Sequence, residues 1–159
     1  MKKLILLRHG KAEEFAATDF ERALKERGSA QSKQRGAWLK QKQFIPDLIL
    51  SSDALRTRET THQVIEGLEL PDAPVQWQHA LYNATSSTIL SHILTTDDTI
   101  QTLLVIGHNN GISELASFFH SDYVGLKTSG FAVFDFATKH WSELLNVSIK
   151  HKYVQQESE

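Results

Sequence analysis

The sequence contains no cysteine, and this absence removes several kinds of chemistry at once. Without thiols the chain cannot form disulfides, use a cysteine nucleophile or bind zinc through thiolates. The redox compartment stays open, because a chain without cysteine fits either an oxidising or a reducing environment. Any nucleophile or anion-binding group must therefore come from other side chains.

Long apolar runs are also absent, and neither sign of charge dominates. No stretch approaches the roughly 20 apolar residues that a bilayer-spanning helix requires. The apolar run at 4–7 is far shorter than a signal peptide needs and ends at Arg8 and His9, so we expect it to stay on a cytoplasmic protein that binds no membrane. A net charge of −2 argues against a broad nucleic-acid surface, which needs clustered Lys and Arg. Any anion site should be local.

The size and composition are those of an ordinary globular protein. With 159 residues, 40% hydrophobic and 23% charged, the chain suffices for one domain with a substantial core and is short for two. No linker, repeat or low-complexity segment divides it. We predict one domain over residues 1–150 and a polar C-terminal tail over 151–159.

Short apolar runs alternate with segments of helical periodicity through most of the chain. The runs predict strands at 4–7, 48–50, 75–77, 103–106, 131–136 and 141–147. Helices are expected from the break at Gly28 and Ser29 to about residue 43, from the capping residues 51–53 to about 67, at 85–94 and at 111–119. This order predicts a three-layer α/β/α sandwich with a largely parallel sheet and an antiparallel edge.

Cationic and imidazole side chains follow three of these predicted core strands. Arg8 and His9 end the first strand, Arg56 lies in the first turn of the helix after the second, and His108 follows a later strand. The carboxyl ends of parallel strands share one edge, where open α/β sheets bind ligands, so we expect these groups to converge. Guanidinium groups bind phosphate oxygens in bidentate fashion, and helix starts add backbone donors. The pattern predicts a phosphate-binding site.

The ordered combination of these motifs resembles the histidine phosphatase superfamily, whose fold is phosphoglycerate-mutase-like. The matching motifs are LLRHGKAE at 6–13, Asp19, Arg22, Leu24 and Gly28 after it, Ser52-x-x-x-Arg56 with Thr60, and Gly107-His108. The short length and the lack of a large inserted domain resemble the small, SixA-type phosphohistidine phosphatase branch. Each motif alone is weak, but together they cover nearly the whole chain in the right order.

The resemblance implies a role for each matching residue. His9 would be the nucleophile and would be phosphorylated transiently, while Arg8, Arg56 and His108 would bind the phosphoryl oxygens. Arg22 would assist or meet the substrate. Physical chemistry supports this arrangement, because a neutral imidazole nitrogen is a competent nucleophile and neighbouring guanidinium groups disfavour its protonation. The same cations can stabilise the charge on the phosphoryl oxygens in the transition state.

The segment 79–84, HALYNA, departs from superfamily members that act on alcohol phosphates, because it lacks the carboxylic acid that protonates the leaving oxygen. Imidazole, with a pKa of about 6.5, leaves far more readily than an alkoxide, whose conjugate acid approaches the pKa of water at about 15.7. We therefore expect the chain to dephosphorylate phosphohistidine on a signalling protein. His79, Glu13 and Glu14 remain alternative proton donors.

Two other functions stay open at this point. The chain could dephosphorylate small metabolites, or it could bind a phosphate or phosphoprotein without turnover, although a binding module has no use for an uncharged nucleophile such as His9. No ligand spacing typical of metal sites is present, so we expect neither a metal nor a cofactor. The expected partners are a phosphohistidine-bearing domain or a small phosphorylated substrate, and the chain itself is expected to be a monomer or weak dimer.

Overall fold

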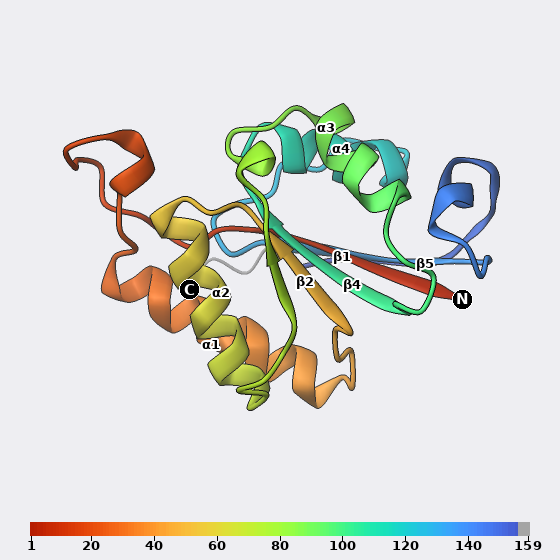
Figure 1. The fold of residues 1–159 in the computed structure, drawn as a ribbon, viewed down its shortest axis with the longest axis horizontal. Coiled ribbons are helices and arrows are strands. Elements are labelled where there is room, and N and C mark those ends of the chain that lie inside the picture. The colour runs from red at the N-terminus through yellow and green to blue at the C-terminus, as the bar shows by residue number, and fades with distance from the viewer. Residues whose placement is uncertain (156–159) are drawn as a thin grey trace.

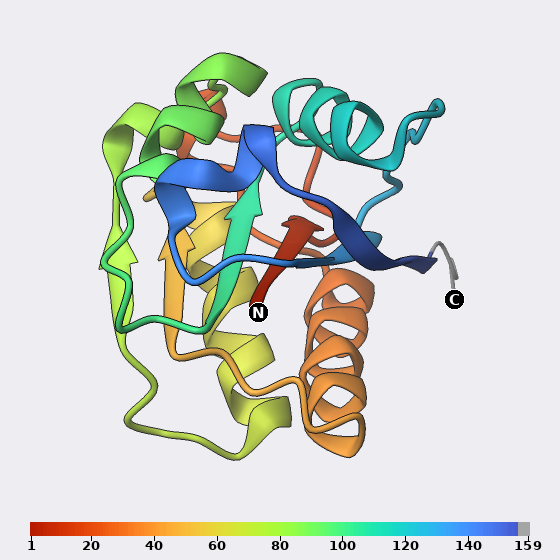
Figure 2. The ribbon, with the colours of Figure 1, turned by 90° about the vertical axis from the view of Figure 1, so that its right-hand side faces the viewer.

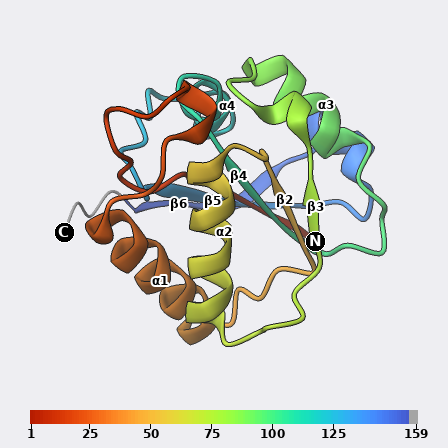
Figure 3. The same cartoon turned by 60° about the vertical axis from the view of Figure 1, so that its left-hand side comes forward.

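The computed structural model describes residues 1–155 and contains a six-stranded sheet in the order β3-β2-β4-β1-β5-β6. The strands are β1 (Lys2–Arg8), β2 (Leu48–Ser51), β3 (Val75–Trp77), β4 (Thr102–Gly107), β5 (Phe131–Phe136) and β6 (Ile149–Gln155). The first four are parallel, whereas β5 runs antiparallel to β1 and β6 antiparallel to β5. Figure 3 shows β3 and β6 at opposite edges. The predicted parallel sheet with an antiparallel edge is confirmed.

Helices cover both faces of this sheet (Figures 1 and 2). The helices are α1 (Glu26–Gln41) and α2 (Leu55–Leu68) on one face, and α3 (Ser86–Leu94) and α4 (Gly111–His120) on the other. Alternate residues of β1 serve the two cores: Leu4 and Leu6 pack under α3 and α4, and Ile5 and Leu7 under α1 and α2. The α/β/α layering predicted from the sequence is therefore present. Within residues 1–155, no helix combines the length and apolar character needed to cross a membrane.

The parallel strands end together at one edge of the sheet. Arg8 of β1 is paired with Gly107 of β4, and Ser51 of β2 with Ile106. The segment between β1 and α1, which includes the short 3-10 helix η1 (Asp19–Glu21), projects beyond this edge (Figure 1). Another short 3-10 helix, η2 (His79–Leu81), follows β3. Side chains from several distant segments can therefore reach one place.

The strand predicted at 141–147 is wrong, and of the tail predicted at 151–159 the part through residue 155 is wrong. Residues Trp141–Asn146 form the 3-10 helix η3, because Trp141 and Leu144, three residues apart, are both buried on the core side. The last strand is instead β6, whose polar residues through 155 pair with β5. Its lysines suit the edge of a sheet, where one side of the strand faces solvent. Residues 156–159 of the predicted tail lie outside the described residues.

Helix α1 begins at Glu26 rather than at the predicted break near Gly28. Gly28 lies inside the helix, and a glycine is needed there because another part of the chain passes very close. A Cβ at this position would come within 2.2 Å of the Lys11 carbonyl oxygen. This glycine permits a close approach of two backbones and does not mark a helix end. The approach holds the segment after His9 against α1.

Candidate active site

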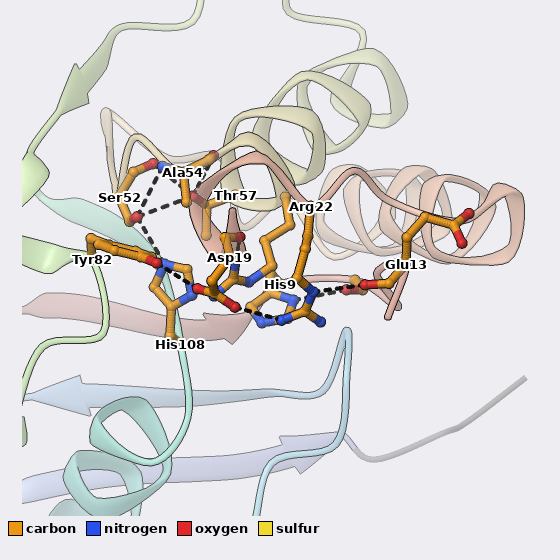
Figure 4. A network of polar contacts seen from close by, with 11 residues as sticks. His9, Glu13, Asp19, Arg22, Ser52, Ala54, Thr57, Tyr82 and His108 are labelled. Atoms are coloured by element: carbon orange, nitrogen blue, oxygen red, sulfur yellow. Dashed lines mark hydrogen bonds and ion pairs between the residues drawn. The ribbon is translucent and has the colours of Figure 1, made fainter. Parts of the chain in front are cut away.

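The four residues singled out at the strand ends come together in the structure. His9 and His108, which follow β1 and β4, have ring centroids 5.3 Å apart. His9 is 7% exposed, His108 2% and Arg56 4%, whereas Arg8 is partly buried. In Figure 4 the side chains of His9 and His108 lie beside those of Asp19 and Arg22. The charges of Arg56 and Arg8 act on His9, so the predicted convergence of Arg8, His9, Arg56 and His108 is present. Their catalytic roles stay predictions.

One nitrogen of His9 is already used by the backbone. The Nδ1 atom lies 2.8 Å from the Gly10 carbonyl oxygen, and because a carbonyl oxygen only accepts, Nδ1 must carry the proton. Burial lowers the pKa of His9 to about 3; the hydrogen bond to Gly10 opposes that shift, and the charges of Arg56, Arg8 and Arg22 add to it. At neutral pH the ring is therefore uncharged, and Nε2 carries the lone pair.

His108 is held from one side only. Its Nε2 atom lies 2.8 Å from the Ser52 hydroxyl, and its Nδ1 atom is buried without a hydrogen-bond partner in the described chain. Burial lowers the pKa of His108 to about 3, and repulsion from His9 and Arg56 acts in the same direction. Both histidines are therefore neutral near pH 7.

The guanidinium groups of Arg8 and Arg56 are positioned by hydrogen bonds to the backbone, but some of their donors have no acceptor in the part of the chain that the structure describes. Arg8 donates from Nη1 to the Leu126 carbonyl at 3.0 Å, and Arg56 donates from Nη1 to the Asp19 carbonyl at 2.8 Å. The Nε atoms of both arginines are buried without a partner among the described residues. Burial also lowers the pKa of Arg8 from its usual value. Buried donors without acceptors are uncommon in proteins, and several together indicate a site for an anion.

Asp19 and Tyr82 complete the rim of the site, and neither received a role from the sequence. The Asp19 carboxylate accepts from Arg22 at 2.8 Å, from Arg56 at 3.1 Å and from the Tyr82 hydroxyl at 2.5 Å. The hydrogen bonds from Tyr82 and Arg22 are the main reason that the pKa of Asp19 lies far below its usual value. The hydrogen bond between Tyr82 and Asp19 also raises the pKa of Tyr82. Asp19 is thus ionised and offers no proton to a leaving group.

The sequence held partial signals for these residues. Asp19 stands in the motif that carries the family resemblance, and Tyr82 lies in the segment 79–84, where a carboxylic acid is missing. The carbonyl of Leu126 that orients Arg8 gives no side-chain pattern, so the sequence could not reveal it. Arg22, a candidate for substrate contact, donates from Nε to the Glu13 carbonyl and reaches the site through Asp19.

The three alternative proton donors lie at the margin. His79 is exposed and its Nδ1 atom is 2.9 Å from Asp53, while its ring lies 5.9 Å from that of Tyr82. The Glu13 side chain points away from His9 in Figure 4, and Glu14 is exposed. Of these candidates, His79 is the one whose contacts lead toward the site.

The site as a whole places a neutral imidazole beside buried hydrogen-bond donors. Its composition suits a phosphoryl group, whose oxygens accept from guanidinium and imidazole N–H groups while the phosphorus faces the histidine nitrogen. Among residues 1–155, no group of three or more His, Cys, Asp or Glu side chains could hold a metal ion. A neutral imidazole beside these donors supports nucleophilic chemistry.

Comparisons with known proteins place this architecture. The model of the histidine phosphatase superfamily (branch 1) matches residues 4–83. A solved structure assigned to phosphohistidine phosphatase SixA from Agrobacterium tumefaciens is 31% identical, covers 84% of this chain and 91% of its own, and has a TM-score of 0.75. The phosphohistidine phosphatase SixA homolog of Haemophilus influenzae is 29% identical over 72% of this chain and 74% of its own. A mycobacterial glucosyl-3-phosphoglycerate phosphatase, 13% identical with a TM-score of 0.70, covers 95% of this chain and 98% of its own and shares the fold.

The fold and the paired histidines therefore define a protein of the phosphoglycerate-mutase-like class. The chain belongs to the histidine phosphatase superfamily. Within it the similarity is to the small SixA-type proteins, as the sequence motifs indicate. The family model ends before His108, so the second histidine is placed in the site by the structure.

Proposed function

We propose that this chain is a phosphatase that acts through a phosphohistidine intermediate on His9, and that its substrate is phosphohistidine on a signalling protein. The observation that carries the proposal is the orientation of His9. Its Nδ1 proton is given to Gly10, which leaves the Nε2 lone pair of a neutral ring beside cationic side chains. A non-catalytic phosphate binder has no need of that lone pair.

The reaction takes two displacements. In the first, His9 Nε2 attacks phosphorus and the bond from phosphorus to the substrate nitrogen breaks. The substrate ring carries a proton on its other nitrogen, so its imidazole leaves as a neutral molecule. In the second, water attacks phosphorus, the bond to His9 breaks, and inorganic phosphate leaves with the second proton lost to solvent. Arg8, Arg56 and His108 stabilise the charge on the phosphoryl oxygens in both steps.

The environment of Asp19 supports the choice of a nitrogen leaving group. Asp19 is the carboxylate that contacts Arg56 and Tyr82, and its lowered pKa keeps it ionised. An alcohol leaving group needs a proton donor, whereas an imidazole leaves without strong acid help. The same contacts also explain how Arg22 would meet the substrate: it shares Asp19 with Arg56 at the rim.

The intermediate can be tested directly. Wild-type protein incubated with phosphoramidate, a small compound with a phosphorus–nitrogen bond, should form an acid-labile phosphoryl adduct that mass spectrometry assigns to His9. His9→Gln should bind tungstate, a phosphate analogue, but form no adduct. His62→Gln, a substitution outside the site, is the matched control. Labelling that persists in the His9 variant would contradict the role of His9.

The substrate class needs a separate comparison. We expect kcat/KM for a phosphohistidine-bearing protein domain to exceed that for sugar phosphates by at least about 100-fold, because the site, within the described residues, offers no strong acid to protonate an alkoxide leaving group. The alternative is a phosphatase for small metabolites, which is favoured by the shared fold with the glucosyl-3-phosphoglycerate phosphatase and by His79 at the rim. A preference for a sugar phosphate that is lost in His79→Gln would establish that alternative. Tungstate binding without turnover of any substrate would indicate a binding module.

A further inference from the structure

The buried Nδ1 atom of His108 poses a question about a proton. A neutral imidazole carries one proton, on either Nδ1 or Nε2, and the two tautomers offer opposite groups to a ligand. Nδ1 of His108 has no partner in the described chain, and Nε2 contacts the Ser52 hydroxyl at 2.8 Å. The tautomer is thus decided by the direction of the hydrogen bond with Ser52.

The surroundings of Ser52 favour one direction for that hydrogen bond. The backbone N–H of Ala54 donates to Ser52 Oγ at 3.3 Å, which occupies one lone pair. The Thr57 hydroxyl lies 2.9 Å from the carbonyl oxygens of both Ser52 and Ala54, which only accept, so its proton is used there. Ser52 keeps its own proton, and its shortest side-chain contact is Nε2 of His108, compared with 3.2 Å to Thr57.

From this geometry we infer that Ser52 is a positioning residue that donates its hydroxyl proton to Nε2 of His108 and thereby fixes the ring proton on Nδ1. The inference deepens the proposed function and rests on it for its link to catalysis. In this tautomer the buried Nδ1–H is a hydrogen-bond donor for a phosphoryl oxygen. In the opposite tautomer a lone pair would face the anion, and the contact would be repulsive.

Ser52 and Gly10 therefore give the two histidines different tasks through the same tautomer. In His9, Nδ1–H is spent on the Gly10 carbonyl and the bare Nε2 is left as nucleophile. In His108, Nε2 is spent on Ser52 and Nδ1–H is left as donor. Two neutral imidazoles with centroids 5.3 Å apart are differentiated by one backbone carbonyl and one hydroxyl.

The proton positions can be read from long-range ¹H–¹⁵N correlation spectra of histidine-labelled protein, with signals assigned through His9→Gln and His108→Asn. In wild type we expect the Nδ1–H tautomer at both His9 and His108. Ser52→Ala should allow the Nε2–H tautomer at His108 alone and weaken tungstate binding about tenfold, the equivalent of one neutral hydrogen bond. His9 serves as the internal reference.

The neighbouring hydroxyl provides a matched control. Ser51 is as fully buried as Ser52, and its Oγ donates to the Ser52 carbonyl without touching His108. Ser51→Ala should leave the His108 tautomer and the tungstate affinity as in wild type. An equal loss in both variants would mean that burial of a hydroxyl matters and that the tautomer does not.

Two results would overturn the inference. One is an Nε2–H signal for His108 in wild type, which needs no variant and so does not depend on how Ser52→Ala folds. The other is an unchanged Nδ1–H signal and unchanged tungstate affinity in a folded Ser52→Ala protein. Neither outcome touches the proposed function, whose failure would instead appear as wild-type protein without a His9 adduct.

Discussion

The two ends of β1 each carry a cationic side chain, and the two side chains differ in whether their hydrogen-bond donors have acceptors. Lys2, at the start, is fully buried and its Nζ donates to the carbonyls of Asp98 at 2.6 Å and Ile100 at 2.7 Å. Arg8, at the end, makes one contact to Leu126 and keeps a buried Nε without a partner in the described chain. A buried cation whose donors all have acceptors stabilises the fold. A buried cation with a donor that lacks an acceptor indicates a binding site for an anion.

The largest expected difference is in activity. Arg56→Ala should lower kcat/KM for a phosphorylated substrate by about 10²- to 10³-fold, the usual loss when one charge-stabilising donor is removed. Steady-state kinetics on wild type and variant measure the ratio.

Helix α2 offers a matched control for that substitution. Arg58 lies two residues further along α2 and is exposed, with its Nε donating to the Asp53 carbonyl. Arg58→Ala should change kcat/KM by less than about threefold. Comparable losses in the two variants would mean that general positive charge, and not the buried donors, accounts for the activity.

At the other end of β1 we expect a loss of stability without a loss of activity. Lys2→Met should lower the free energy of unfolding by about 2 kcal/mol, because two carbonyl oxygens lose a charged donor. kcat/KM should stay within about twofold of wild type, since the strand separates Lys2 from the site by about 20 Å. Denaturant unfolding measures the first quantity.

Lys3→Met tests whether the buried hydrogen bonds of Lys2 cause the loss of stability in Lys2→Met. Lys3 pairs with Asp135 at 2.8 Å and remains partly exposed, so its loss should cost less than about 1 kcal/mol. If Lys2→Met instead weakened tungstate binding, the contrast between the two ends of β1 would fail.

The smallest expected difference between variant and wild type concerns the dependence of stability on pH. An unfolded histidine titrates near its usual pKa of about 6.5, while in the folded protein burial lowers the pKa of both His9 and His108 to about 3. Below about pH 6.5 these two histidines bind protons in the unfolded chain but stay unprotonated in the folded protein, so stability falls as pH falls toward about 3. Each histidine contributes a slope of up to about 1.4 kcal/mol per pH unit.

This slope can be measured by denaturant unfolding at about pH 6 and about pH 5, where carboxylates contribute least. His108→Asn should reduce the fall in stability between the two conditions by about 1 kcal/mol. A variant with the wild-type slope would show that His108 is protonated in the folded protein. That result would also remove the tautomer argument for Ser52.

Much of the architecture follows from local patterns. The apolar runs that became β1 and β4 are continuous because both of their faces are covered. The helix predicted at 85–94 is α3, and Thr85 caps it by accepting from the Thr88 N–H. The prediction fails near the C-terminus. There the polar strand β6 exists because β5 offers it an edge, a tertiary fact that no local pattern contains.

The sequence by itself determined that Arg8, His9, Arg56 and His108 follow core strands, and the shared edge of a parallel sheet made their meeting predictable. Tertiary structure alone decided which atoms of these residues remain available. Gly10 takes one nitrogen of His9, Ser52 one nitrogen of His108, and Leu126 part of Arg8. The physical reason is that hydrogen-bond direction and burial depend on groups distant in sequence. A sequence pattern can therefore identify the residue, but it cannot show which of its atoms is left to contact a ligand.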